Sequence, residues 1–173
     1  PPTQNAAGLI RRLVQAVRNR WPKAKVRVRL DGGFASPKIF DLLEILDVEF
    51  AVAIASNERL DELADPLLQN ARQLFKRDQQ SWQVFDAFAY QAHSWSRARR
   101  VVAKAEVVHH PGRAPRDNVR FVVTSMQQRP ERVYQFYKQR GDSENRIKEL
   151  LDDMGLDRTS CHGFEANAFR NLL

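Results

Sequence analysis

The apolar and polar positions of the first 56 residues predict a helix and two strands around a second helix. Residues 8–20 show helical spacing, and Pro22 ends the pattern. Residues 25–31 alternate apolar and charged side chains, which is typical of a strand with one exposed face, whereas residues 48–55 are almost wholly apolar. We expect the first helix to lay an apolar stripe on a sheet, formed by Leu9, Ile10, Leu13, Val14 and Val17.

A helix is predicted between the two strands. Ser36 is a good N-cap and Pro37 suits the first helical position. The buried face of this helix is expected to comprise Ile39, Phe40, Leu43 and Leu46. A strand, a helix and a strand within about 30 residues are typical of a right-handed parallel crossover.

The pattern changes after Asn57. Residues 58–76 read as a helix, and three segments with period-two alternation follow, at 82–95, 99–110 and 118–125. A turn-rich stretch at 111–117 separates the last two, and helical spacing returns from Pro130 until Gly155. We therefore predict an α/β fold with an antiparallel β-rich insertion, divided into residues 1–56, 57–129 and 130–173.

Length and composition narrow the class of protein. A chain of 173 residues accommodates one domain or part of one. No run approaches the roughly 20 apolar residues of a membrane span, and no secretory signal pattern opens the chain. The single cysteine, Cys161, excludes an internal disulfide, so we expect a cytoplasmic protein. Because the chain opens on Pro1 rather than methionine, we expect a segment of a longer protein.

The positive charge is concentrated at one end. Residues 1–30 hold eight of the 28 Lys and Arg residues and none of the 21 Asp and Glu residues. Such an asymmetry suits a polyanion, since each cation on a phosphate releases condensed counterions. A solvated basic helix is the alternative interpretation.

Asp31 is the first candidate for chemistry. It follows the predicted strand 25–31 at its carboxyl end, where ligands collect in open α/β sheets. Gly32 and Gly33 would allow a sharp turn or a close approach of the backbone to a ligand, although this is also ordinary turn chemistry.

A second pattern lies near the end of the chain. Arg140, Glu144 and Lys148 are four residues apart and share one helix face, with Tyr137 one turn earlier. An i,i+4 ladder of ion pairs on a solvated helix would give the same pattern. Gly141 fits such a ladder poorly, because glycine costs about 1 kcal/mol in a helix, and it suggests a helix start near Ser143 or the close approach of another chain.

Several long motifs together resemble one known family. "LDGGFASPKIFDLLE", "HSWSRARRVVAKAE", "VRFVVTS" and "YKQRGDSENRIKELLDDMGL" are similar to the DDE transposases of bacterial insertion sequences, transposase DDE domain group 1. The resemblance implies an RNase H-like core, here partial with its leading strands missing, and a β-rich insertion between the second catalytic aspartate and the glutamate. Asp31 matches that aspartate and Glu144 the glutamate.

The resemblance also implies partners and a cofactor. Asp31 and Glu144 would hold Mg²⁺, with Mn²⁺ as a substitute, because hard cations take carboxylate oxygens. The DNA contacts would come from the signature residues Tyr137 and Arg140 and from the nearby Arg146 and Lys148. The intact protein would bind double-stranded transposon ends and target DNA, and it would cleave and transfer DNA strands. It would act as a homodimer in the transposition complex.

Two departures from the family pattern change the expectations. The usual lysine seven residues after the glutamate is replaced by Leu151, so Lys148 would have to serve instead. The first catalytic aspartate has no counterpart, because residues 1–30 contain no carboxylate. We therefore expect the chain alone to be inactive or nearly so.

Two other functions compete with this interpretation. A non-catalytic DNA-binding fragment of a decayed transposase would use the same basic helix and leave the carboxylates unused. A signalling phosphoacceptor at Asp31 is disfavoured, because the antiparallel segment interrupts the βα alternation that such a domain needs.

The remaining polar and aromatic residues carry weaker signals. His109, His110, His162 and Cys161 lack the paired spacing of a zinc site. Trp82 and Trp95 are expected to pack in the core or against a hairpin. A DNA contact through the arginines near Trp95 stays open, and these are Arg97, Arg99 and Arg100.

Overall fold

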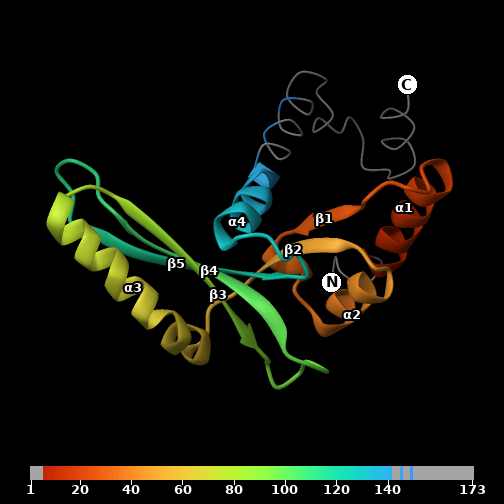
Figure 1. The fold of residues 1–173 in the computed structure, drawn as a ribbon, viewed down its shortest axis with the longest axis horizontal. Helices are drawn as coiled ribbons and strands as arrows, with labels where there is room; N and C mark the ends of the chain where they lie inside the picture. Colours follow the sequence, from red (N-terminus) through yellow and green to blue (C-terminus); the bar gives the residue numbers. More distant parts are fainter. Residues whose placement is uncertain (1–5, 142–144, 146–148, 150–173) are drawn as a thin grey trace, which may run out of the picture. The chain divides into compact units, whose positions relative to one another are not determined.

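The computed structural model describes residues 6–141, 145 and 149. The chain divides into two compact units, Pro1–Tyr137 and Lys138–Leu173. The elements follow the order α1 (Ala6–Arg20), β1 (Arg27–Leu30), a short 3₁₀ turn η1 (Gly32–Phe34), α2 (Pro37–Ile45), β2 (Glu49–Ile54), α3 (Glu58–Asp78), β3 (Trp82–Tyr90), β4 (Arg99–Val108), β5 (Arg116–Thr124) and α4 (Pro130–Lys138) (Figure 1).

The five strands form one mixed sheet in the order β1-β2-β5-β4-β3. β1 and β2 are parallel, with Val28 opposite Phe50, which confirms the predicted parallel crossover. The pairs β2–β5, β5–β4 and β4–β3 are antiparallel, as the period-two patterns predict. The β-rich segment therefore continues the sheet that β1 and β2 begin, and α3 runs along its strands (Figure 1).

One face of the sheet carries the main core. Val101 and Ala103 of β4 belong to the same buried cluster as Phe50 of β2 and Phe40 of α2. Residues of α1 and α3 complete this cluster, so three helices cover the face. The ring centroid of Phe40 lies 6.4 Å from that of Phe50 and 5.2 Å from that of Trp95. The second contact confirms the expected core position of Trp95.

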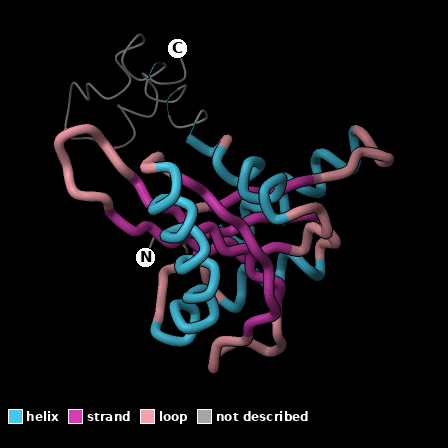
Figure 2. Tube along the Cα trace, turned by 60° about the vertical axis from the view of Figure 1, so that its left-hand side comes forward, coloured by secondary structure: helices cyan, strands magenta, loops and turns pink. Residues whose placement is uncertain are grey.

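The opposite face is covered by α4. Val102, which alternates with Val101 and Ala103, packs with Met126 and with Val133 of α4 in a second cluster. Figure 2 shows the strands crossing the middle of the molecule with helices beside them. Because helices cover both faces of β4, that strand is buried along nearly its whole length rather than on alternate residues.

The expected apolar stripe of α1 is only partly buried. Ile10 and Val14 lie in the core, but Leu9 and Leu13 are 51% and 57% exposed. The prediction that all five apolar positions pack on a sheet is thus wrong for these two leucines. The reason is geometric: the buried positions Ala6, Ile10 and Val14 lie four residues apart and form one narrow seam.

The local signals for α2 and for the last helical segment hold to different degrees. Ser36 is the N-cap of α2 and Pro37 its first residue, although the Ser36 hydroxyl makes no capping hydrogen bond. A turn at Gln139 ends α4, and Arg140 and Gly141 are helical, whereas Ser143, near which a helix start is predicted, lies outside the described residues. Among the described residues, a Cβ on Gly141 would contact no atom within 4 Å.

Candidate catalytic edge of the sheet

Asp31 lies directly beyond the carboxyl end of β1. Its backbone stays extended, at φ −78° and ψ 177°, and it forms the N-cap of η1. The Asp31 carboxylate accepts a hydrogen bond from the Gly33 amide at 2.9 Å. The side chain is partly exposed, so strand geometry displays a carboxylate at the sheet edge, as the sequence predicts.

The two glycines after Asp31 have different roles. A Cβ on Gly33 would lie 3.1 Å from Oδ1 of Asp31, which is tighter than an ordinary contact. A Cβ on Gly32 would lie 3.8 Å from the Ala53 carbonyl oxygen, an ordinary van der Waals distance. Gly33 therefore allows the Asp31 carboxylate to fold back onto its own turn, and neither glycine has a positive φ.

The carboxyl end of β2 meets that of β1 at the same edge, because the two strands are parallel. Asn57 follows β2 and caps α3, with its side-chain oxygen accepting from the Leu60 amide at 3.1 Å. Ser56 donates a hydrogen bond to the Asp61 carboxylate. This edge thus presents polar groups from two successive strand ends.

Arg29 links the strand of Asp31 to α4. Its guanidinium donates to the Phe136 carbonyl at 3.3 Å and lies 5.4 Å from the centroid of the Phe136 ring. Arg29 and Asp31 are two residues apart on extended backbone, so their Cα–Cβ bonds point to the same side of the sheet. Tyr137 follows Phe136 at the end of α4, and its ring lies 6.0 Å from that of Tyr134.

The structure thus brings the strand of Asp31 and the helix of Tyr137 together within the first unit. Arg140 belongs to the second unit, where it is helical and partly buried. Glu144, Arg146 and Lys148 lie outside the described residues, as does Leu151. The His162 and Cys161 positions also lie outside them.

Two of the three arginines near Trp95, Arg99 and Arg100, hold structural contacts. Arg99 is 5% exposed, and its guanidinium binds both oxygens of Glu44 at 2.8 and 2.9 Å and Asp41 at 2.5 Å. It lies 5.3 Å from the ring centroid of Phe40. Arg100 donates to backbone carbonyls of the segment after β5, so neither of these two guanidiniums is available to DNA without breaking these contacts.

The contacts of Arg99 with Asp41 and Glu44, called the arginine clamp below, change the pKa of Glu44. Burial alone would raise the pKa of Glu44, but hydrogen bonds from Arg99 and from the exposed Arg97 hold it below its ordinary value. The same contacts raise the pKa of Arg99 despite its burial. Asp41 and Glu44, on α2, are residues that sequence reasoning missed; their i,i+3 spacing on one helix face was the available signal.

A second ionic network lies beneath α4. Lys104 and Glu106 of β4 are each 7% exposed and pair at 2.5 Å. Glu106 also accepts from the Asn118 amide, and the Lys104 ammonium lies 5.3 Å from the Tyr134 ring centroid. Burial and the nearby Glu106 charge raise the pKa of Tyr134. The contact of Lys104 with Tyr134 joins this network to α4 and adds to the apolar packing of Val102 with Val133.

The described part of the chain contains no group of three or more His, Cys, Asp or Glu residues placed to hold a metal ion. Asp31 has the hard oxygen donors that Mg²⁺ prefers, but one carboxylate does not make a site. Its fit to a divalent cation therefore depends on a second donor, and Glu144 is the candidate.

Across the described residues, no helix is long and apolar enough to cross a bilayer.

Comparison with known proteins gives one clear result. The family model described as "Transposase DDE domain group 1" matches residues 1–173, the whole chain. Comparison with curated proteins gave no match. Comparison with solved structures likewise gave none.

Proposed function

The chain belongs to the transposase DDE domain group 1 family, and on that premise we propose that it binds transposon-end DNA and contributes Asp31 and Glu144 to metal-dependent strand cleavage and transfer. The observation that carries the proposal is the family match over all 173 residues. The place of Asp31 at the carboxyl end of β1, the edge where α/β sheets bind ligands, supports its role.

Asp31 and Glu144 would hold Mg²⁺ or Mn²⁺. A bound pair of such ions stabilises the attacking and leaving oxygens of an in-line phosphoryl displacement. The protein's part is to present hard oxygen donors from distant segments at one edge. The Gly33 amide fixes the Asp31 carboxylate before any ion binds, which limits the side-chain entropy lost on binding.

DNA is proposed to contact the segment that follows α4 in the chain. Arg140 and Arg146 would bind phosphates through their planar guanidinium groups, and Lys148 would act as a point charge in place of the usual lysine. Tyr137 would stack on a base or donate to a phosphate oxygen. We propose that this segment and the sheet are parts of an RNase H-like core, and that two copies cooperate on paired transposon ends.

The sequence supplies two of the three carboxylates of the family's catalytic set, since residues 1–30 contain none. We therefore expect very little strand cleavage by the 173-residue chain, even when it binds DNA and metal. The proposal is tested best by a readout that requires metal binding but not turnover.

Localised cleavage of the protein backbone by Fe²⁺ provides such a readout. Fe²⁺ with ascorbate and peroxide cuts the backbone close to the bound ion, and excess Mg²⁺ should suppress those cuts. We expect cuts near Asp31 and near Glu144, both lost in Asp31→Asn and in Glu144→Gln. Asp86→Asn is the matched control, because Asp86 is an exposed carboxylate on β3.

Cuts that persist in Asp31→Asn, or cuts near only one of the two residues, would overturn the shared metal site. Salt-dependent DNA binding without any localised cuts would instead favour the non-catalytic DNA-binding fragment. The two candidate functions are thus separated by one pair of measurements on the same protein.

A further inference from the structure

A hollow lies at the amino end of β1, whereas Asp31 follows the carboxyl end of the same strand. Its volume is about 590 Å³, and it opens between the turn after α1, the start of β1 and the end of α2. Four of its lining residues are cationic: Arg18, Lys23, Lys25 and Arg97. From Lys25 to Asp31 the chain advances six residues, which is about 20 Å in extended conformation. The hollow is therefore separate from the proposed catalytic edge.

The carboxylates of the hollow are outnumbered by cations. Glu49 pairs with Lys25 at 2.6 Å and with Arg27 at 2.7 Å, and these contacts keep the pKa of Glu49 below its ordinary value although burial opposes this. Glu44 is likewise held by both Arg97 and Arg99. With Asp47 as the third carboxylate, four cations and three carboxylates line the hollow, so a net positive charge is left at the surface.

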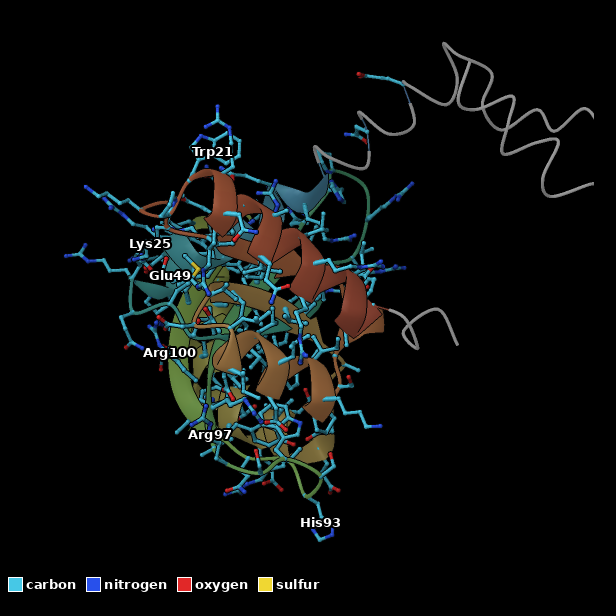
Figure 3. All side chains as sticks on the ribbon, turned by 90° about the vertical axis from the view of Figure 1, so that its right-hand side faces the viewer. Trp21, Lys25, Glu49, His93, Arg97 and Arg100 are labelled. Atoms are coloured by element: carbon cyan, nitrogen blue, oxygen red, sulfur yellow. The ribbon has the colours of Figure 1, made fainter. Side chains whose placement is uncertain are left out.

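An exposed tryptophan, Trp21, directly precedes Pro22, which lines the hollow. Trp21 follows α1 and is 58% exposed, whereas Trp95 is 8% exposed. Figure 3 shows Trp21, Lys25, Glu49 and Arg97 along the same side of the molecule. The Arg20 guanidinium lies 5.6 Å from the Trp21 ring centroid, which adds a further cation to this indole.

We propose that this surface binds a DNA strand that has an unpaired base. We call it the amino-edge surface and define it as Arg18, Arg20, Trp21, Lys23, Lys25 and Arg97. A solvent-exposed indole among cations is suited to stack on a base while the cations contact the flanking phosphates. Bases inside a duplex are already stacked on each other, so the indole selects a single strand or a frayed end.

This inference rests on the proposed function for the identity of the nucleic acid, but it concerns a different end of the sheet. It adds a contact about 20 Å from Asp31 that holds an unpaired strand apart from the cleavage edge. Neither Asp31 nor Glu144 takes part in it. The two proposals can therefore fail separately.

The test is the binding of a fluorescein-labelled oligothymidylate to the 173-residue chain, followed by anisotropy without divalent metal at several salt concentrations. Stacking contributes about 1–3 kcal/mol per base, so Trp21→Ala should weaken binding about 5- to 150-fold. Lys23→Gln should lower the slope of log K against log salt by about 0.7. Quenching of tryptophan emission by unlabelled oligothymidylate should vanish in Trp21→Phe.

Two controls make comparable changes elsewhere, one at a tryptophan and one at an exposed cation. Trp82→Phe, on β3, should retain both the quenching and the affinity. Arg113→Gln removes an exposed cation from the turn between β4 and β5 and should leave the salt slope unchanged. Trp21 and Lys23 are exposed, and circular dichroism checks that all variants fold.

Unchanged affinity in Trp21→Ala, or an equal loss in Trp82→Phe, would overturn the proposal. So would equally tight, Trp21-dependent binding of a blunt duplex or competition by phosphatidylglycerol vesicles, since the latter would indicate a lipid surface. Asp31→Asn should bind the oligothymidylate normally. If it does, and the unsubstituted chain shows no Fe²⁺ cuts, the catalytic proposal fails and this one stands.

Discussion

The guanidinium of Arg29 contacts Phe136 twice, through the carbonyl oxygen at 3.3 Å and through the ring at 5.4 Å. These residues are 107 positions apart, and their contact joins β1, which Asp31 directly follows, to the last turn of α4. A cation on a carbonyl of the last turn also complements the helix dipole. The relationship makes Arg29 the link between the proposed catalytic edge and the helix that leads to Arg140.

The first prediction concerns this link. Arg29→Met keeps much of the side-chain length but removes the charged hydrogen bond and the cation–π contact, so we expect it to lower the free energy of unfolding by about 1–2 kcal/mol. Arg29→Lys should recover part of the loss. Urea unfolding followed by circular dichroism gives the values.

Arg27→Met is the control on the same strand. Arg27 pairs with Glu49 at an exposed position, and such pairs contribute about 0–1 kcal/mol. Equal destabilisation by Arg27→Met and Arg29→Met would show that the contact with α4 is not the cause.

The second prediction concerns the arginine clamp on α2. Arg99→Met leaves the carboxylates of Asp41 and Glu44 without their buried partner. A fully buried broken pair costs about 3–5 kcal/mol. Because Asp41 is 44% exposed, we expect a smaller loss of about 2–3 kcal/mol in thermal or urea unfolding.

Arg97→Met provides the comparison for the clamp, because Arg97 also binds Glu44 but is 61% exposed. We expect its loss to cost less than about 1 kcal/mol. If Arg97→Met lowers the free energy of unfolding as much as Arg99→Met does, burial is not the reason for the larger contribution expected of Arg99.

These contacts show where reasoning from sequence reaches its limit. Local periodicity predicted α1, the β1–α2–β2 crossover, α3 and three antiparallel strands, because burial on one face imposes a period that is legible in the sequence. It did not predict that Leu9 and Leu13 remain exposed or that Arg99 is buried. Both depend on which distant residues pack nearby, and periodicity contains no information about that.

The candidate site also has one feature that the sequence predicts and one that it does not. The display of Asp31 at a strand end follows from local rules, since a strand, an aspartate and two glycines define the turn. The contact of Arg29 with Phe136 does not, because nothing local relates two residues more than 100 positions apart. The proposed meeting of Asp31 with Glu144 is a relationship of the same long-range kind.

The third prediction is a dependence of stability on pH. Burial opposes it, but hydrogen bonds from Lys104 and Asn118 hold the pKa of Glu106 below its ordinary value of 4.5. A carboxyl whose pKa is depressed in the folded state stabilises the protein above the unfolded pKa. That stability is lost as the pH falls through the folded pKa. The free energy of unfolding should therefore decrease as the pH is lowered beyond about 4.5.

Glu106→Gln isolates this contribution. It should cost about 1–3 kcal/mol at pH 7, because Lys104 loses its buried partner, and should give a shallower fall in stability below pH 4.5. Denaturant unfolding between pH 3 and 7 measures both. An unchanged slope in Glu106→Gln would assign the acid sensitivity to other carboxylates, of which Glu44 is the first to test.

The last prediction compares the two glycines after Asp31, since only one of them faces a carboxylate. Neither has a positive φ, so alanine at either position gains about 0.4–1 kcal/mol from a less flexible unfolded chain. Gly32→Ala meets only the Ala53 carbonyl at 3.8 Å and should show that gain. Gly33→Ala places a Cβ 3.1 Å from Oδ1 of Asp31 and must displace the carboxylate.

We therefore expect Gly33→Ala to be less stable than Gly32→Ala by about 1 kcal/mol, the net value of a typical hydrogen bond. It should also weaken the Fe²⁺ cuts near Asp31, which Gly32→Ala should leave intact. Equal stability with equal cuts in the two variants would mean that the Gly33 amide does not hold the carboxylate. The order that this hydrogen bond imposes on Asp31 would then have no consequence for metal binding.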